Sequence, residues 1–408
     1  MLRPARAARA AALAASVLLA ALGLPSRAAA QAPAAPPTPN TAAAPAAPAA
    51  AAGRWTAERA RAWHDSVGWL VGANFAPSTA INQLEMWQAA TWDPATIDRE
   101  LGWARSLGMN TMRVFLHDQL WAQDSTGFLR RVDEFLTIAA RHNIRPMLVF
   151  FDSVWDPFPQ AGPQRAPYPH LHNSGWVQSP GRALLADTAR HDALRPYVQG
   201  VVARFANDRR VLAWDLFNEP DNINRPAYFA LEPRNKAELA LALLRKQVAW
   251  VRAARPSQPI TMAPWHGDWS EQGLTPIDRF MFDNSDVITF HSYDDLPTTR
   301  RKVETLRRYN RPLIATEYMA RPTGSTFGIT LPYFKQERVG AYNWGFVAGK
   351  SQTIYPWDSW TREYTAEPAL WFHDIFRADG SAYDQGEVAV IRALTGAAQA
   401  ARPAARRR

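Results

Sequence analysis

The sequence predicts a single-domain (β/α)8 barrel, because eight short apolar runs alternate with longer amphipathic segments along one stretch of chain. Continuous apolar runs of this length are typical of parallel strands buried on both faces. The expected strands are WLVGANF (69–75), TMRVFL (111–116), RPMLVFF (145–151), VLAWDLF (211–217), PITMAPW (259–265), DVITFHSY (286–293), PLIATEY (312–318) and AYNWGFV (341–347). Eight strands are the number that closes a barrel of this kind.

The segments between these runs have apolar residues at three-to-four spacing, which predicts helices that cross back over the sheet. Expected helices include residues 97–107, 128–142, 194–207, 237–254 and 300–310. An open, doubly wound sheet would show the same alternation of strand and helix. That fold usually has a glycine-rich phosphate-binding turn after its first strand, and no such turn follows residues 69–75. The closed barrel is therefore favoured.

The two ends of the chain differ in composition from its body. Residues 1–30 combine arginines, an apolar stretch at 11–24 and small residues at 28–30, which predicts a cleaved signal peptide and export to the periplasm or beyond. A retained anchor is the alternative, although the stretch is short of the roughly 20 residues that span a bilayer. Residues 31–52 are almost wholly Ala, Pro and Thr and predict a linker. The barrel is expected over 53–396, followed by a basic low-complexity tail at 397–408.

The net charge of +9 does not indicate a nucleic-acid partner, because it is concentrated at the termini. Four arginines without an acid lie in the first thirty residues and four in the last eight, so the body carries 9 − 4 − 4 = +1. Cysteine is absent, which excludes a disulfide framework and thiolate metal ligands. We expect a monomer that needs no cofactor and has no membrane span once the signal is cleaved.

Two glutamates follow expected strands at the end where a barrel places its active site. Glu219 follows the fourth run in WDLFNEP, and Glu317 ends the seventh run in IATEY. A single glutamate in such a position is as readily a helix cap or an ion-pair partner. A pair can hydrolyse a glycosidic bond, with one carboxyl group donating a proton and the other meeting the charge that develops at the anomeric carbon. A gap of about 5–5.5 Å predicts retention of configuration, and about 6.5–9.5 Å predicts inversion.

Asn218-Glu219-Pro220 after the fourth strand, with Glu317 ending the seventh, resembles the clan of retaining barrel glycosidases that includes the cellulase and mannanase family 5. The resemblance covers about residues 68–394. It implies a β-linked glycan substrate, of β-1,4-mannan or glucan type. It also implies that Glu219 is the acid/base and that Glu317 is the nucleophile of a double displacement.

The resemblance implies roles for further residues near the strand ends. Arg113 matches an arginine that keeps the nucleophile ionised, with an internal salt bridge as the alternative. Tyr293 would donate to Glu317, and His291 would position Glu219 unless it is an ordinary core histidine. Asn218 would contact a sugar hydroxyl. We expect Glu219 to stay protonated through poor solvation or the charge of Glu317, which its partners keep ionised.

Aromatic side chains are expected to form the sugar-binding surface. Trp344 resembles the tryptophan that stacks beneath the sugar ring at the cleavage point. The chain has 17 tryptophans in all. Further subsites are expected at Trp155, Trp265, Trp269, Trp357 and Trp360, and hydroxyl contacts at Asn74 and Asp152. The sequence departs from the family pattern at Phe151-Asp152-Ser153, where a histidine often stands. The long segment 152–190 is expected to cover part of the cleft.

Two other classes of function remain open at this point. One is a barrel that binds a glycan without cleaving it, which the presence of both carboxylates disfavours. The other is a metal-dependent hydrolase, which needs a cluster of His or Asp ligands at strand ends. Among the histidines only His291 is so placed, and His170 and His172 lack a third ligand at an evident spacing. We therefore expect no metal.

Overall fold

The computed structural model describes residues 53–225 and 227–397. These residues form a sheet of eight parallel strands, hydrogen-bonded in the order β5-β4-β3-β2-β1-β8-β7-β6. The strands are β1 (Val71–Asn74), β2 (Thr111–Phe115), β3 (Met147–Asp152), β4 (Ala213–Asn218), β5 (Ile260–Ala263), β6 (Ile288–Ser292), β7 (Leu313–Tyr318) and β8 (Gly340–Asn343). Each lies within or next to one of the eight runs, so the predicted (β/α)8 barrel is confirmed.

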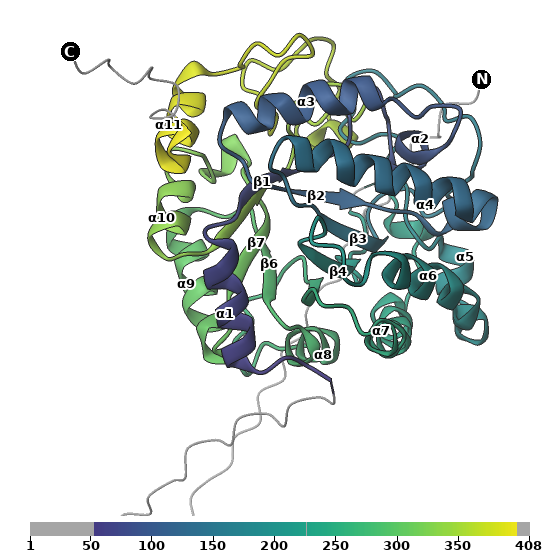
Figure 1. Cartoon of the computed structure of the whole chain (residues 1–408). Helices are drawn as coiled ribbons and strands as arrows, with labels where there is room; N and C mark the ends of the chain where they lie inside the picture. The colour runs from purple at the N-terminus through teal and green to yellow at the C-terminus, as the bar shows by residue number, and fades with distance from the viewer. Residues whose placement is uncertain (1–52, 226, 398–408) are drawn as a thin grey trace, which may run out of the picture. The chain divides into compact units, whose positions relative to one another are not determined.

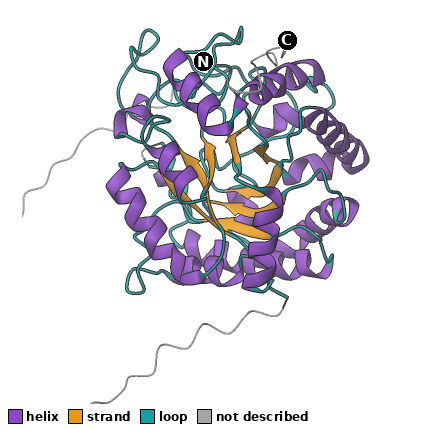
Figure 2. Cartoon of the chain, turned by 60° about the vertical axis from the view of Figure 1, so that its left-hand side comes forward, coloured by secondary structure: helices purple, strands orange, loops and turns teal. Residues whose placement is uncertain are grey.

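The strands stand inside a ring of helices (Figures 1 and 2). The α-helices in the described residues are α1 (Ala57–Val67), α2 (Gln83–Trp87), α3 (Pro94–Ser106), α4 (Asp118–Arg141), α5 (Arg182–Leu185), α6 (Arg195–Phe205), α7 (Lys236–Ala253), α8 (Pro276–Asn284), α9 (Leu296–Leu306), α10 (Thr330–Gln336) and α11 (Gln385–Thr395). Short 3-10 segments are η1 (Thr188–Leu194), η2 (Phe229–Leu231), η3 (Arg307–Tyr309), η4 (Arg321–Thr323) and η5 (Trp357–Trp360). None of the described helices is long and apolar enough to span a bilayer.

The barrel closes between β5 and β6, at the two ends of the hydrogen-bonded order. The amide of Asp286 donates to the carbonyl of Ile260 at 2.8 Å. The hydroxyls of Thr261 and Thr289 are 2.8 Å apart, and that of Thr289 also donates to the carbonyl of Met262. Short polar side chains thus join the two strands across the seam where no regular ladder forms.

The structure differs from the predicted helices mainly at α4. The helix was expected from residue 128 but begins at Asp118, because the side chain of His117 caps it by accepting from the amide of Gln119. Asp124 has non-helical backbone angles, so the first turns form a separate short stretch before the amphipathic part. The expected signal peptide, the linker and all but the first residue of the basic tail lie outside the described residues.

Three strands lose their regular register near their carboxyl ends. The pairing shifts between Asp215 and Asn218 in β4, between Phe290 and His291 in β6, and within β7 after Ala315. Such bulges turn the following side chains to a new direction and occur often beside active sites. Here they lie just before the residues that meet at the mouth of the barrel.

Candidate active site

Glu219 is the first residue after β4, and its backbone is bent sharply toward the barrel mouth. Its φ of +45° is in the left-handed region, which costs a non-glycine residue on the order of 1 kcal/mol. The amide of Glu219 donates to the carbonyl of Ala263, and its carbonyl accepts from the amide of Asn222 at 3.0 Å across a turn with Pro220. Because proline suits the second position of such a turn, the Glu-Pro sequence itself helps to aim the carboxyl group.

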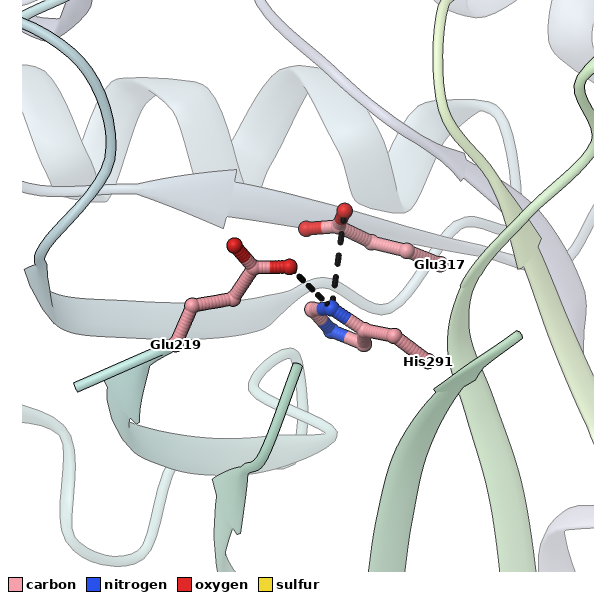
Figure 3. A group of neighbouring side chains, drawn as sticks. All are labelled: Glu219, His291 and Glu317. Atoms are coloured by element: carbon pink, nitrogen blue, oxygen red, sulfur yellow. Dashed lines mark hydrogen bonds and ion pairs between the residues drawn. The ribbon is translucent and has the colours of Figure 1, made fainter. Parts of the chain in front are cut away.

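Glu219, His291 and Glu317 converge at the carboxyl ends of β4, β6 and β7 (Figure 3). One oxygen from each carboxylate and a ring nitrogen of His291 all lie within 4.8 Å of one another. Both carboxyl groups are buried, with Glu219 7% and Glu317 5% exposed. The upper limit of 4.8 Å is compatible with the separation of about 5–5.5 Å in retaining glycosidases and lies below the roughly 6.5–9.5 Å of inverting ones.

Glu317 is held by two strong donors. Arg113 on β2 donates from Nη1 to Oε1 at 3.0 Å, and the hydroxyl of Tyr293 donates to Oε2 at 2.7 Å. Arg113 is fully buried, and Asp215 on β4 is its counter-ion at 2.8 Å. The guanidinium also donates to the side-chain oxygens of Asn74 and Asn218. A fixed, permanently charged group thus lies directly against the carboxylate expected to be ionised.

Glu219 has a different set of partners. Its Oε1 is 2.6 Å from Nδ1 of His291, and its Oε2 accepts from Nδ2 of Asn222 at 2.6 Å. The same nitrogen of His291 lies 3.6 Å from Oε2 of Glu317, so the imidazole bridges the two carboxyl groups. Burial lowers the pKa of His291 to about 3, which keeps this ring neutral.

Burial raises the pKa of both glutamates. For Glu219 the pKa is raised to about 7 mainly by desolvation, as expected. For Glu317 desolvation raises the pKa to about 7 even though Arg113 and Tyr293 act in the opposite direction. Arg113 and Tyr293, which were expected to keep Glu317 ionised, thus oppose the effect of burial without outweighing it. Near neutral pH the pair holds about one shared proton, which is better placed on Glu219 because the cation lies against Glu317.

A cavity of about 220 Å³ opens above the two carboxyl groups. Of the residues predicted from the sequence, it is lined by Asn218, Glu219, Tyr293, Glu317, Trp344, Trp155, Trp265 and Trp357. Trp344 follows β8 and packs edge-on against Phe115 and Trp176, so its orientation is set by neighbouring aromatic rings. Arg113 and His291 lie beneath this layer. The cavity combines two carboxyl groups with flat aromatic walls, which suits the apolar faces of sugar rings.

Two residues expected to contact sugar hydroxyls, Asn74 and Asp152, do not line this cavity. Asn74 lies outside this cavity and donates to the carbonyls of Thr316 and Asn343, while its oxygen accepts from Arg113. Asp152 is 1% exposed and accepts from Asn218, Trp176 and Gln83, so it holds Asn218 in place beneath the cavity.

Two of the predicted tryptophan subsites also lie elsewhere. Trp269 is fully buried and packs edge-on against Phe282 and Phe290, in the core and not in the cavity. Trp360 does not line the cavity but stacks on Trp155 at 5.4 Å between ring centroids, so it supports a wall residue.

The sequence reasoning missed Asp215 and Asn222. Asp215 is an acid inside an apolar strand, and such a residue needs a buried cation; pairing it with the arginine in TMRVF would have identified the ion pair. Asn222 lies in the turn after Glu219 and lines the cavity with Asn224 and Arg225. Nothing in its local sequence distinguishes it from an ordinary turn asparagine.

The trio of Glu219, His291 and Glu317 has a spacing that a metal ion could also use. Its chemistry suits a proton better, because Arg113 already supplies a positive charge to Glu317 and His291 lies within hydrogen-bond distance of Glu219. His170 and His172 contact the main-chain carbonyls of Tyr364 and Tyr355 through their Nδ1 atoms. These contacts hold the segment after β3, from which His172 also lines the cavity.

Comparison with known proteins gives both a family match and structural matches. The sequence model of the cellulase family (glycosyl hydrolase family 5) matches residues 76–360. A GH5_18 protein from Streptomyces cattleya, solved with Manβ1-4GlcNAc, is 14% identical with a TM-score of 0.55, over 83% of this chain and 82% of that one. No curated protein matches.

Two further solved structures share the fold. An exo-β-1,4-mannosidase from an Opitutaceae bacterium is 19% identical with a TM-score of 0.55, over 81% of this chain and 60% of that one. A hyperthermostable endo-1,4-β-D-mannanase from Thermotoga petrophila is 12% identical with a TM-score of 0.51, over 81% of this chain and 99% of that one.

Proposed function

This chain belongs to glycosyl hydrolase family 5 and is an O-glycosyl hydrolase, and we propose that it cleaves β-linked glycans with retention of configuration. The observation that carries the proposal is the spacing of Glu219 and Glu317, whose nearest oxygens lie within 4.8 Å. That spacing favours direct attack by one carboxylate over the use of an intervening water.

In the first step Glu219 donates its proton to the glycosidic oxygen while Glu317 attacks the anomeric carbon. The bond to the leaving group breaks, and a covalent glycosyl ester forms on Glu317. In the second step the ionised Glu219 takes a proton from water, whose oxygen attacks the same carbon and releases Glu317. Arg113 and Tyr293 stabilise the carboxylate of Glu317 before attack and again as it departs.

We propose a β-1,4-linked mannan or glucan, or an oligosaccharide of these, as substrate. The support comes from the tryptophans of the cavity and from the solved structures of similar fold, which include a mannosidase and a mannanase. Export to the periplasm or the exterior, suggested by residues 1–30, would bring the enzyme to such polymers. N-terminal sequencing of protein recovered from the producing cells would test the cleavage.

The test of the function is a screen of mannans, glucans and their oligosaccharides for newly released reducing ends, run with the wild type and with Glu317→Gln. We expect release by the wild type on at least one β-1,4-linked substrate and none by the variant. The alternative is a barrel that binds glycans without cleaving them. It predicts measurable binding to an oligosaccharide with no reducing ends released by either protein.

A further inference from the structure

We propose that Asn222 determines which oxygen of Glu219 carries the acid proton, and that the buried ion pair between Lys236 and Glu232 holds Asn222 in place for this task. The inference rests on the proposed role of Glu219 as acid/base. It adds a positioning device, built from the turn after β4 and the first residue of α7, that acts on that one carboxyl group.

The orientation of the Asn222 amide is fixed by its neighbours. The main-chain amide of Asn224 donates to one end of this side chain at 2.7 Å. A main-chain N–H can only donate, so the atom that faces it is the oxygen Oδ1. The other end, which lies 2.6 Å from Oε2 of Glu219, is therefore the NH2 group and donates to the carboxyl.

This donation makes the two oxygens of Glu219 inequivalent. A carbonyl oxygen accepts a hydrogen bond better than a hydroxyl oxygen does, so donation to Oε2 favours protonation at Oε1. Oε1 is the oxygen that lies 2.6 Å from Nδ1 of His291. The proton is thereby kept at the oxygen next to the bridging imidazole and away from the turn.

Lys236 fixes the backbone that carries Asn222. Its ammonium group donates to the carbonyl of Asn222 at 2.6 Å and to that of Ser153 at 3.0 Å. The side chain is only 1% exposed, and its counter-ion Glu232 lies 2.9 Å away and is equally buried. Glu232 in turn accepts from the side-chain amide of Asn224. Both ends of the Asn222–Asn224 segment are thus held by one ion pair.

A buried ion pair is weak evidence of stabilisation, because desolvation offsets much of the attraction between the charges. Lys236 and Glu232 do make specific contacts, however, and three of the four reach the turn after Glu219 or the start of the loop after β3, while the fourth is with Gln178. This concentration of contacts is what a positioning role requires. The pair fixes one geometry of the turn at the catalytic carboxyl group.

Several other groups face Glu219 and set its titration together with Asn222. They come from β2, β6, β7, the turn itself and the segment after β5, and they are Arg113, His291, Glu317, Asp221 and His266. Asn222 donates a hydrogen bond that stabilises the ionised form of Glu219, and its amide does not titrate. Removing its amide should therefore raise the pKa of Glu219 without altering the other charges.

The test measures the titration of the Glu219 carboxyl directly, by NMR of protein labelled with ¹³C at the glutamate carboxyl groups and with Glu219→Gln to assign the signal. For Asn222→Ala we expect the midpoint to rise by about one pH unit, the effect of one hydrogen bond to a charged group. Asn222→Asp keeps the shape and an acceptor for Asn224, and we expect an equal or larger rise. Unchanged midpoints in these variants would overturn the proposal.

Lys236→Met tests whether the ion pair with Glu232 holds Asn222 in place, and Arg252→Met is its matched control. Arg252 pairs with the buried Asp286 at the opposite end of the barrel. Both variants should lower the melting temperature, but only Lys236→Met should raise the midpoint of Glu219. If neither moves it, Lys236 is merely structural and this part of the proposal is wrong.

The same rise in the Glu219 midpoint should appear in the alkaline limb of the pH profile of kcat/KM, measured on a substrate with a poor leaving group. The titration needs no turnover, so a wild type that releases no sugar would overturn the proposed function and leave this measurement readable.

Discussion

The carboxyl groups of Glu219 and Glu317 approach within 4.8 Å of each other, yet each has partners of a different kind. Glu317 accepts from a buried guanidinium and a phenol, whereas Glu219 contacts an amide and a neutral imidazole. This asymmetry separates the roles of two chemically identical side chains.

The two glutamates should respond differently to removal of their charge. Glu317→Gln should reduce kcat at least 1,000-fold on every substrate, because no nucleophile remains. Glu219→Gln should be similarly slow on an unactivated glycan but should retain a fast first step on an aryl glycoside with a good leaving group, which needs no proton. Burst kinetics with dinitrophenyl glycosides would measure this. Equal losses on both substrates would contradict the assignment.

Arg113→Met should impair both stability and catalysis, because it leaves Asp215 as an uncompensated buried charge. Breaking a buried pair in this way typically costs about 3–5 kcal/mol in the free energy of unfolding. The double variant Arg113→Met/Asp215→Leu should regain much of that stability, as measured by urea denaturation. It should not regain activity, since Glu317 still lacks its cation. Recovery of activity in the double variant would show that Arg113 serves only to neutralise Asp215.

Glu219→Gln should be more stable than the wild type at alkaline pH. Burial raises the pKa of Glu219 from 4.5 to about 7 in the folded protein. The protonated Glu219 carboxyl makes its full contribution to the free energy of unfolding below pH 4.5. This contribution is lost as the pH rises toward 7, because Glu219 ionises at a lower pH in the unfolded chain than in the folded protein. The variant avoids this loss, so its advantage should be absent near pH 4, grow to on the order of 1–3 kcal/mol by pH 8 and then level off. Denaturant unfolding across this range tests it, and a constant difference would contradict it.

Trp344 and Trp269 offer a matched comparison between a cavity wall and the core. Trp344→Ala should raise KM or lower kcat/KM about tenfold through loss of the stacking surface. Trp269→Phe should lower the melting temperature while leaving KM unchanged, since that ring packs against Phe282 and Phe290. Steady-state kinetics together with thermal unfolding separates the two effects. An unchanged kcat/KM in Trp344→Ala would remove this ring from the binding surface.

The barrel could be predicted from the sequence because parallel strands buried on both faces are continuous apolar runs. Each of the eight runs became a strand, and the common direction of the strands explains why Glu219 and Glu317 meet although nearly a hundred positions separate them. The start of α4 could not be predicted in the same way. Residues 118–127 are mostly polar and lack a sustained helical period, and their helix depends on a cap from His117.

The fates of single side chains were harder to predict than the strands. Asn74 and Asp152 end strands as expected, but their polar atoms are hydrogen-bonded to neighbouring side chains beneath the cavity. Trp269 follows β5 closely, yet its ring turns into the core. The position of a residue in the sequence predicts how near it lies to the barrel mouth. The direction of its side chain depends on local irregularities such as the β-bulges in β4, β6 and β7.

The most direct test of the double displacement is the anomeric configuration of the first sugar released, followed by ¹H NMR before mutarotation. A nucleophile and an acid held this close predict that a β-linked substrate yields the β-anomer first, with the α-anomer appearing later by equilibration. Initial release of the α-anomer would mean that water attacks directly, and it would contradict the role assigned to Glu317.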